Sequence, residues 1–374
     1  MKKYIFILFI AISISSFSQD NIKYSETIIA SDLKKHLTIL ASDSLEGRET
    51  GKPGQKMAAD YIMNHFKNIG IPPYKKKTYY QKFKVKSGRH LCKCDDCDQS
   101  LVKKILGSKK KIKGENVLGY IEGTDLKEEL IIITAHYDHL GKHDSLIFNG
   151  ADDDGSGTVA AMEIAEAFML SKKAGQGPRR SVLVMAVSGE EKGLLGSKYY
   201  TDHPIYPLEK TVANLNIDMI GRIGDFKDNP NYVYLIGADR LSQELHDINE
   251  QVNNEHIGLE LDYTFNEEDD PNRYYYRSDH YNFAKNNIPV IFYFNGIHED
   301  YHKVTDTVEK IDFDKIRSDG FAFQIEVLHQ LKQLDMKGLE VPTVFINRTE
   351  GSSKMGSNEM MQFITMCISY IGRK

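Results

Sequence analysis

Short apolar runs alternate with segments of helical periodicity along most of the chain after residue 116. The β-branched run at residues 130–135 is typical of a buried strand, and residues 156–170 carry the apolar spacing of a helix. Strands that are joined through helices pair in parallel, and the helices pack on both faces of the sheet. The sequence therefore predicts a three-layer α/β/α fold with a mixed, largely parallel central sheet. The strands are predicted at residues 117–121, 130–135, 181–187, 211–217, 232–236 and 288–294.

The remaining segments predict one compact domain, at residues 19–335, with a tail after it. Residues 30–70 hold two amphipathic opening helices, and residues 78–115 are polar, lysine-rich and cysteine-bearing, with a weak strand signal near their start. Residues 116–335 form the expected core, and a last helix is predicted at about 312–333. Residues 336–374 are the expected C-terminal tail.

The first eighteen residues are typical of a signal peptide. Lys2 and Lys3 precede an apolar run at residues 4–14, and the small-residue sequence Ser16-Phe17-Ser18 follows. A spanning helix needs roughly 20 apolar residues, and this run is shorter. We therefore expect residues 1–18 to direct export to the periplasm or the extracellular space, and we expect no membrane span in the mature chain.

Charge and cysteine content narrow the classes of partner. The formal net charge is -5, from 48 basic and 53 acidic residues. This balance offers no basic face for nucleic acid, so a nucleic-acid partner is not expected. Cys92, Cys94 and Cys97 lie close together and Cys367 is remote, which in an oxidising compartment allows one or two disulfides of open pairing. The alternative, a structural zinc site, lacks a second ligand pair.

Residues able to bind metal lie at or after the ends of predicted strands, where open α/β sheets place their ligands. His136 and Asp138 end one strand, and Asp138 is expected to orient the imidazole of His136. Three adjacent aspartates, including Asp153 and Asp154, stand in a glycine-bounded loop. Packed carboxylates repel one another unless a cation offsets the repulsion. For Asp154 the alternative is a helix cap.

Two further strands are followed by carboxylates. Glu190 and Glu191 follow the strand at 181–187, so one can bind metal while the other transfers protons, although such a pair is more often a surface feature. Asp218 ends the strand at 211–217, and His302 follows the last strand. An isolated aspartate or histidine of this kind is commonly structural. Together, these residues predict a hydrolytic site for two zinc ions, with the ligands His136, Asp153, Glu191, Asp218 and His302.

The same residues resemble the motifs of the secreted bacterial zinc aminopeptidases, a family that includes relatives of glutamate carboxypeptidase and glutaminyl cyclase. The resemblance covers most of the chain after residue 40. Its motifs are Leu40 to Arg48, Gly51-Lys52-Pro53-Gly54, His136-Tyr137-Asp138, Gly150 to Gly157, Glu190-Glu191, Asp218-Met219, Ser278-Asp279-His280 and Tyr301-His302.

The resemblance implies a role for each residue. One zinc ion would be held by His136 and Asp218, and the other by Glu191 and His302, with Asp153 bridging the two. Glu190 would be the general acid and base, and Asp138 would support His136. A tyrosine before Ser278, for which Tyr275 is the nearest match, would polarise the scissile carbonyl. The domain at residues 19–335 would then be a zinc peptidase domain.

The expected function is hydrolysis of the N-terminal peptide bond of peptides with a free N-terminus, by a hydroxide held between two metals with Glu190 as base. A carboxypeptidase or dipeptidase is an alternative, with Arg273 or Arg277 available for a substrate carboxylate. A glutaminyl cyclase is another, although the chain has no tryptophan of the kind that such relatives use. A non-catalytic binding module is disfavoured by the intact ligand set.

Overall fold

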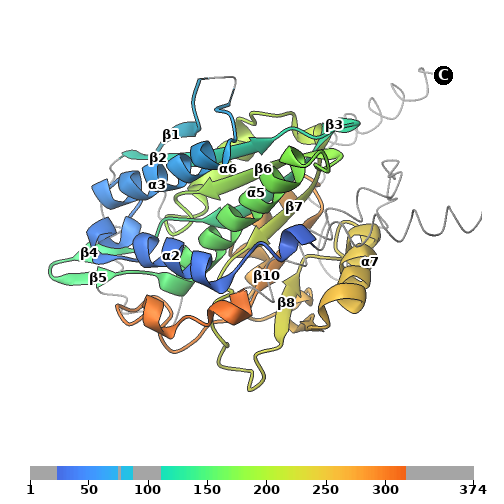
Figure 1. Ribbon diagram of the computed structural model, residues 1–374. Coiled ribbons are helices and arrows are strands. Elements are labelled where there is room, and N and C mark those ends of the chain that lie inside the picture. The colour runs from blue at the N-terminus through green and yellow to red at the C-terminus, as the bar shows by residue number, and fades with distance from the viewer. Residues whose placement is uncertain (1–22, 75–76, 87–110, 317–374) are drawn as a thin grey trace, which may run out of the picture. The chain divides into compact units, whose positions relative to one another are not determined.

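The computed structural model describes residues 23–74, 77–86 and 111–316 (Figure 1). The predicted signal peptide, the four cysteines, most of the last helix and the tail lie outside these residues. In the part of the chain that is described, no helix is both long enough and apolar enough to cross a membrane.

An eight-stranded sheet forms the centre of the molecule, in the order β1-β2-β6-β3-β7-β10-β8-β9. Its middle strands β6, β3, β7 and β10 are parallel. β1 and β2 are antiparallel to each other, β2 is antiparallel to β6, and β8 is antiparallel to β10 and parallel to β9. This topology confirms the predicted mixed, largely parallel sheet. The strands are β1 Tyr80–Lys86, β2 Lys111–Ile121, β3 Leu126–His136, β6 Arg180–Val187, β7 Thr211–Ile217, β8 Tyr232–Ile236, β9 Glu260–Asp262 and β10 Val290–Phe294, and a separate hairpin pairs β4 Gly141–His143 with β5 Leu146–Phe148.

All six predicted strands are present, and β7 and β8 have the predicted bounds. β10 begins at Val290, two residues later than predicted, because Pro289 has no N–H to donate to a neighbouring strand. Short β9 was not predicted, since three residues are too few for a periodic signal.

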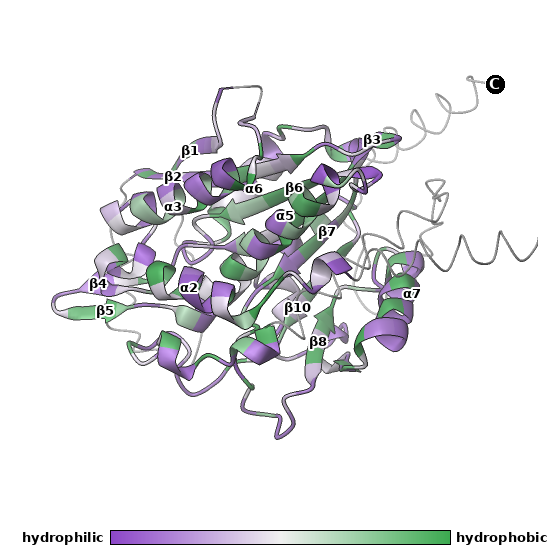
Figure 2. Ribbon diagram, in the orientation of Figure 1, coloured by the Kyte–Doolittle hydropathy of each residue, from purple (hydrophilic) through white to green (hydrophobic). Residues whose placement is uncertain are grey.

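Helices cover both faces of the sheet, as predicted. Helices α2 (Ala30–Leu40), α3 (Pro53–Ile69) and α5 (Gly157–Lys173) pack together on one face. The other face packs against α6 (Leu195–Asp202) and α8 (His280–Ala284), and α7 is a further helix at Gln243–Val252. Figure 2 shows the central strands as mainly hydrophobic and the helices as mixed, which places the core between the layers.

The parallel strands place four loops at one edge of the sheet. β3, β6, β7 and β10 run in the same direction, so their carboxyl ends lie together. His136 is the last residue of β3, and the segments after the other three strands contain Glu190, Asp218 and His302. Residues that are distant in sequence are therefore neighbours at this edge, which is the usual ligand position in open α/β sheets.

Candidate metal centre

The five predicted ligands meet at this edge, and Asp153 lies at their centre. His136 Nε2 is 3.2 Å from Asp153 Oδ1 and 3.6 Å from Asp218 Oδ1. On the other side, His302 Nε2 is 3.0 Å from Asp153 Oδ2 and 3.4 Å from Glu191 Oε2. Each oxygen of Asp153 therefore faces a different histidine and a different second carboxylate, which is the arrangement of a ligand that bridges two ions.

The donors fit divalent cations such as zinc. Asp153 is 4% exposed, and within the described residues its Oδ2 and Oε1 of Glu191 lie near histidine nitrogens without forming a hydrogen bond of good geometry. Buried carboxylate oxygens without partners are costly unless a cation is present. Imidazole nitrogens and carboxylate oxygens are ligands that zinc accepts at catalytic sites. The described residues form two donor groups around Asp153, one with His136 and Asp218 and one with His139 and Glu191.

Electrostatics distinguish Glu190 from Glu191. Burial raises the pKa of Glu190 well above its usual value, with His136 opposing the shift and Glu191 adding to it. Burial acts in the same direction on Glu191, but His302 outweighs it and brings the pKa of Glu191 below its usual range. The side chain of Glu190 is 14% exposed and that of Glu191 is 6% exposed. The two glutamates thus have different environments, as the predicted division of tasks requires.

Asp138 supports the site differently from the prediction. The Nδ1–H of His136 donates to the backbone carbonyl of Asp138 at 3.0 Å, whereas the Asp138 carboxylate is 3.9 Å from the same nitrogen. That carboxylate accepts hydrogen bonds from the Thr50 hydroxyl at 2.5 Å and the Glu190 backbone N–H at 3.3 Å. Asp138 therefore orients His136 mainly through its backbone, and its side chain fixes the start of the Glu190 loop.

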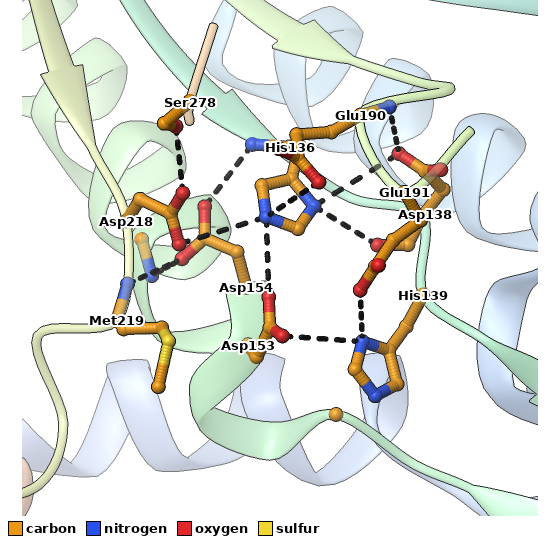
Figure 3. Close-up of polar contacts among 12 residues, drawn as sticks. His136, Asp138, His139, Asp153, Asp154, Glu190, Glu191, Asp218, Met219 and Ser278 are labelled. Carbon is orange, nitrogen blue, oxygen red and sulfur yellow. Dashed lines mark hydrogen bonds and ion pairs between the residues drawn. The ribbon is translucent and has the colours of Figure 1, made fainter. Parts of the chain in front are cut away.

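Asp154 connects three elements of the site (Figure 3). Its carboxylate accepts the backbone N–H groups of His136 at 3.0 Å, Gly157 at 2.9 Å and Met219 at 3.2 Å. The contact with Gly157 is at the first residue of α5, in agreement with the helix-cap alternative. The same carboxylate also joins the ends of β3 and β7. Asp154 is thus a structural residue of the metal centre.

Tyr275 is the tyrosine suggested by the resemblance, and its contacts among the described residues are with Arg240 and neighbouring aromatic rings. Arg240 lies 4.0 Å from the centre of its ring. Its hydroxyl interacts electrostatically with Arg240, Tyr276 and Tyr281, none of which is a predicted ligand. The sequence had placed this residue only by its distance from Ser278.

Tyr301 is the tyrosine that lies against the site. Its ring stacks on that of His302, with 3.8 Å between the centroids. Burial raises the pKa of Tyr301 well above its usual value, and Asp153, Glu191 and Glu190 add to this effect. In the sequence analysis Tyr301 belonged to the motif Tyr301-His302, but no role was predicted for it. The direction of a side chain in a loop cannot be predicted from periodicity.

Two further residues at the site were missed. His139 is fully buried, and its Nδ1 is 2.9 Å from Glu191 Oε1 (Figure 3). Arg48, also buried, donates to the carbonyls of Leu40, Tyr137, Asn149 and Gly150, at 2.6 to 2.8 Å. Each could have been found from one signal only: His139 follows His136-Tyr137-Asp138 directly, and Arg48 ends the first motif.

Comparison with curated proteins gives similarity over less than a third of the chain. Aminopeptidase YwaD of Bacillus subtilis (strain 168) is 33% identical over 110 residues, which cover 29% of this chain and 22% of that protein. A "Probable glutamate carboxypeptidase" of Arthroderma benhamiae is 35% identical over 118 residues, covering 31% of this chain and 15% of that protein. The matched region thus spans less than a quarter of each of these relatives.

Solved structures share the fold over most of the chain. The zinc aminopeptidase BSAP from Bacillus subtilis superposes with a TM-score of 0.60 at 16% identity, covering 81% of this chain and 95% of that one. For the LapA aminopeptidase of Legionella pneumophila the TM-score is 0.62 at 21% identity, with coverage of 84% and 75%. Glutaminyl cyclase of Porphyromonas gingivalis gives 0.56 at 17% identity, with coverage of 81% and 98%.

These structures confirm the α/β fold. A family model also matches the chain directly: the model described as peptidase family M28 covers residues 116–324, which include all five predicted ligands. This match extends over more than half of the 374 residues and shows that the chain belongs to peptidase family M28.

Proposed function

We propose that this protein is a zinc-dependent aminopeptidase that removes the N-terminal residue of peptides. The observation that carries the proposal is the position of Asp153 between two histidines, each of which is paired with a second carboxylate. The proposal is supported by the names of similar proteins, which include aminopeptidase YwaD and two structures described as aminopeptidases.

The two oxygens of Asp153 suggest how two zinc ions would be held. His136 and Asp218 would bind one ion together with Oδ1, and His302 and Glu191 would bind the other together with Oδ2. Zinc in such a site supplies Lewis acidity, which activates water and polarises a carbonyl. The protein contributes a rigid donor set, because Asp154 fixes the backbone at both His136 and Met219.

Glu190 is the proposed general base and acid. Its carboxylate is 4.0 Å from His136 Nε2 and more exposed than that of Glu191, so it borders the site without being committed as a ligand. In the reaction it would accept a proton from the attacking water and then transfer this proton to the amine that leaves. The hydrogen bond from its backbone N–H to Asp138 holds it at this position.

A tyrosine hydroxyl is proposed to donate to the negative charge that develops on the scissile carbonyl oxygen. Tyr275 is the candidate from the resemblance. Tyr301 is the candidate from geometry, since it stacks on His302 and interacts electrostatically with Asp153. We favour Tyr301, because no contact of Tyr275 reaches a predicted ligand among the residues described.

A carboxypeptidase or dipeptidase is the second candidate. Arg273 and Arg277 each lie 4.9 Å from the centre of a tyrosine ring, Tyr276 and Tyr274 respectively, in the segment before Ser278. A guanidinium ion at such a place can bind a substrate carboxylate in a bidentate manner. This candidate predicts cleavage of N-terminally blocked dipeptides, which an aminopeptidase leaves intact.

Export by residues 1–18 is part of the proposal, and it rests on the sequence. N-terminal sequencing of protein from culture medium or periplasm would test it, with a new terminus near Gln19 as the expected result. Retention of Met1 in the cytoplasmic fraction would contradict it.

Activity is tested with a panel of aminoacyl p-nitroanilides, in free and N-terminally blocked forms. We expect purified protein to cleave only the free forms, to lose activity on chelation and to regain it with zinc. Cleavage of blocked dipeptides would favour the carboxypeptidase, and cyclisation of a peptide that begins with glutamine would favour a cyclase. Activity that survives complete removal of metal would contradict the zinc-dependent mechanism.

A further inference from the structure

His139 is a buried histidine in contact with a predicted ligand, although it is not itself among the predicted ligands. It follows β3, is fully buried, and lies beside Asp153 and Glu191 in Figure 3. Its Nδ1 is 2.9 Å from Glu191 Oε1 and 3.8 Å from Asp153 Oδ2. A buried imidazole in this position therefore affects how Glu191 and Asp153 present their oxygens to a cation.

The two oxygens of Glu191 face different histidines. Oε2 is 3.4 Å from His302 Nε2, whereas Oε1 is 2.9 Å from His139 Nδ1. Glu191 therefore presents one oxygen to the side where His302 and Asp153 would share a cation, and the other oxygen to His139. An N–H at Nδ1 of His139 can hold Oε1 and leave Oε2 for the metal.

Oε1 of Glu191 lies closer to Nδ1 of His139, at 2.9 Å, than does Oδ2 of Asp153, at 3.8 Å. Within the described residues, no hydrogen bond of good geometry reaches either ring nitrogen of His139 or Oε1 of Glu191. A buried donor or acceptor that lacks a partner is costly. Nδ1 and Oε1 are therefore best satisfied by pairing with each other.

The position of the His139 ring is fixed from the opposite side. Gly150 has a φ of +53°, and a Cβ at this residue would be 2.4 Å from Cγ of His139. Arg48 donates to the carbonyl of Gly150 at 2.8 Å and to that of Tyr137 at 2.7 Å. The segments on both sides of the ring are therefore held by one buried guanidinium, and the ring is preorganised towards Glu191.

We propose that His139 is a positioning residue that holds Oε1 of Glu191 and thereby sets the affinity of the cation assigned to Glu191 and His302. This inference rests on the proposed two-zinc function and deepens it. Outer partners of metal ligands fix the orientation of those ligands, and their loss typically weakens metal binding about 10- to 100-fold. The cation assigned to His136 and Asp218 should be unaffected.

The test measures zinc binding to purified protein by competition with a chelator, and absorption of the cobalt-substituted protein. We expect His139→Ala to bind one zinc as tightly as the wild type and the other about 10- to 100-fold more weakly. His139→Asn keeps an amide N–H close to the position of Nδ1 and should restore part of the loss. His65→Gln is the matched control, since His65 is a buried histidine between α3 and α5 that contacts the Met162 carbonyl at 3.1 Å; it should bind both ions normally.

His139→Asn also keeps the test decisive if His139→Ala fails to fold. In that case the comparison is His139→Gln, whose amide extends to the position of Nε2 and not to that of Nδ1, and it should bind the second cation more weakly than His139→Asn.

Three results would overturn the inference or its basis. Wild-type affinity for both ions in His139→Ala would exclude a role for His139. Equal loss of the second ion in His139→Ala and His139→Asn, with altered cobalt absorption, would identify a direct ligand in place of a positioning residue. A wild-type protein that binds fewer than two zinc ions would instead contradict the proposed function, and this inference with it.

Discussion

The carboxylate of Asp306 accepts the backbone N–H of Asp153 at 3.2 Å, so the loop that carries His302 also holds the residue proposed to bridge the two ions. The same carboxylate accepts the backbone N–H of Asp152 at 3.0 Å. His302 itself lies 3.0 Å from the Asp153 side chain. The loop at residues 298–306 therefore has two roles. It supplies the predicted ligand His302, and through Asp306 it holds the backbone of the proposed bridging ligand Asp153.

Replacing Asp306 by Asn should disturb this arrangement, because an amide presents an N–H to backbone groups that need an acceptor. We expect the free energy of unfolding to fall by about 1–3 kcal/mol, measured by urea denaturation in the presence of a chelator. Asp144→Asn is the control, since its carboxylate is 89% exposed. Equal stability of the two variants would contradict the role assigned to Asp306.

Arg48→Lys tests the buried guanidinium. A lysine ammonium has fewer donors and lacks the planar geometry that reaches the four carbonyls contacted by Arg48. We expect a loss of about 2–4 kcal/mol in the free energy of unfolding. Arg179→Lys, at an exposed ion pair with Asp125, should change stability by less than about 0.5 kcal/mol. Similar small effects of both substitutions on the free energy of unfolding would contradict the structural role assigned to the four carbonyl contacts of Arg48.

The stability of the domain should depend on pH through His65. Burial lowers the pKa of His65 from 6.5 to about 4, and the nearby His36 adds to the shift. The ring of His36 lies 4.8 Å away, and Glu166 is 3.9 Å from the Nε2 of His65. Between these two pKa values the unfolded chain binds a proton that the native protein does not bind. This contribution to stability is complete above pH 6.5 and is lost as the pH falls to about 4.

The pH prediction is tested by urea denaturation of metal-free protein across this range. The wild type should lose stability on acidification more steeply than His65→Gln, in which the titrating group is absent. His203→Gln, at an exposed histidine, should follow the wild type. A His65→Gln variant with the pH dependence of the wild type would rule out His65 as the source.

Comparison of two tyrosine variants decides which hydroxyl acts on the substrate. Tyr301→Phe should lower kcat by roughly 10²–10³-fold, as removal of a donor to a developing oxyanion does, without loss of zinc. Tyr275→Phe should have a much smaller effect, because Tyr275 packs against Arg240. Steady-state kinetics and metal analysis of both variants provide the test, and the reverse ranking would restore Tyr275.

Much of the fold could be predicted from the sequence, because strands and helices have local signals. The run at residues 130–135 lies within β3, and its end correctly places His136 at the edge of the sheet. Four of the predicted ligands could be proposed for the same reason, because each lies at or after a strand end: His136, Glu191, Asp218 and His302. The resemblance added the assignment of roles, which local patterns do not contain.

The supporting residues could not be predicted in this way. Arg48 reaches carbonyls up to 102 positions away in sequence, and Asp306 reaches a backbone group 153 positions away. Such contacts depend on the folded path of the chain and leave no periodic signal. The backbone contact of Asp138 with His136 was missed for another reason, because residue types predict side-chain chemistry and the hydrogen bond uses a carbonyl oxygen.

The most direct test of the central claim is the activity and zinc content of Glu190→Gln. Glutamine keeps the size of the side chain but cannot accept the proton of the attacking water. We predict a fall in kcat of roughly 10²–10⁴-fold, with two zinc ions still bound. A variant that keeps wild-type activity with both ions in place would contradict the role of Glu190, and with it the proposed mechanism.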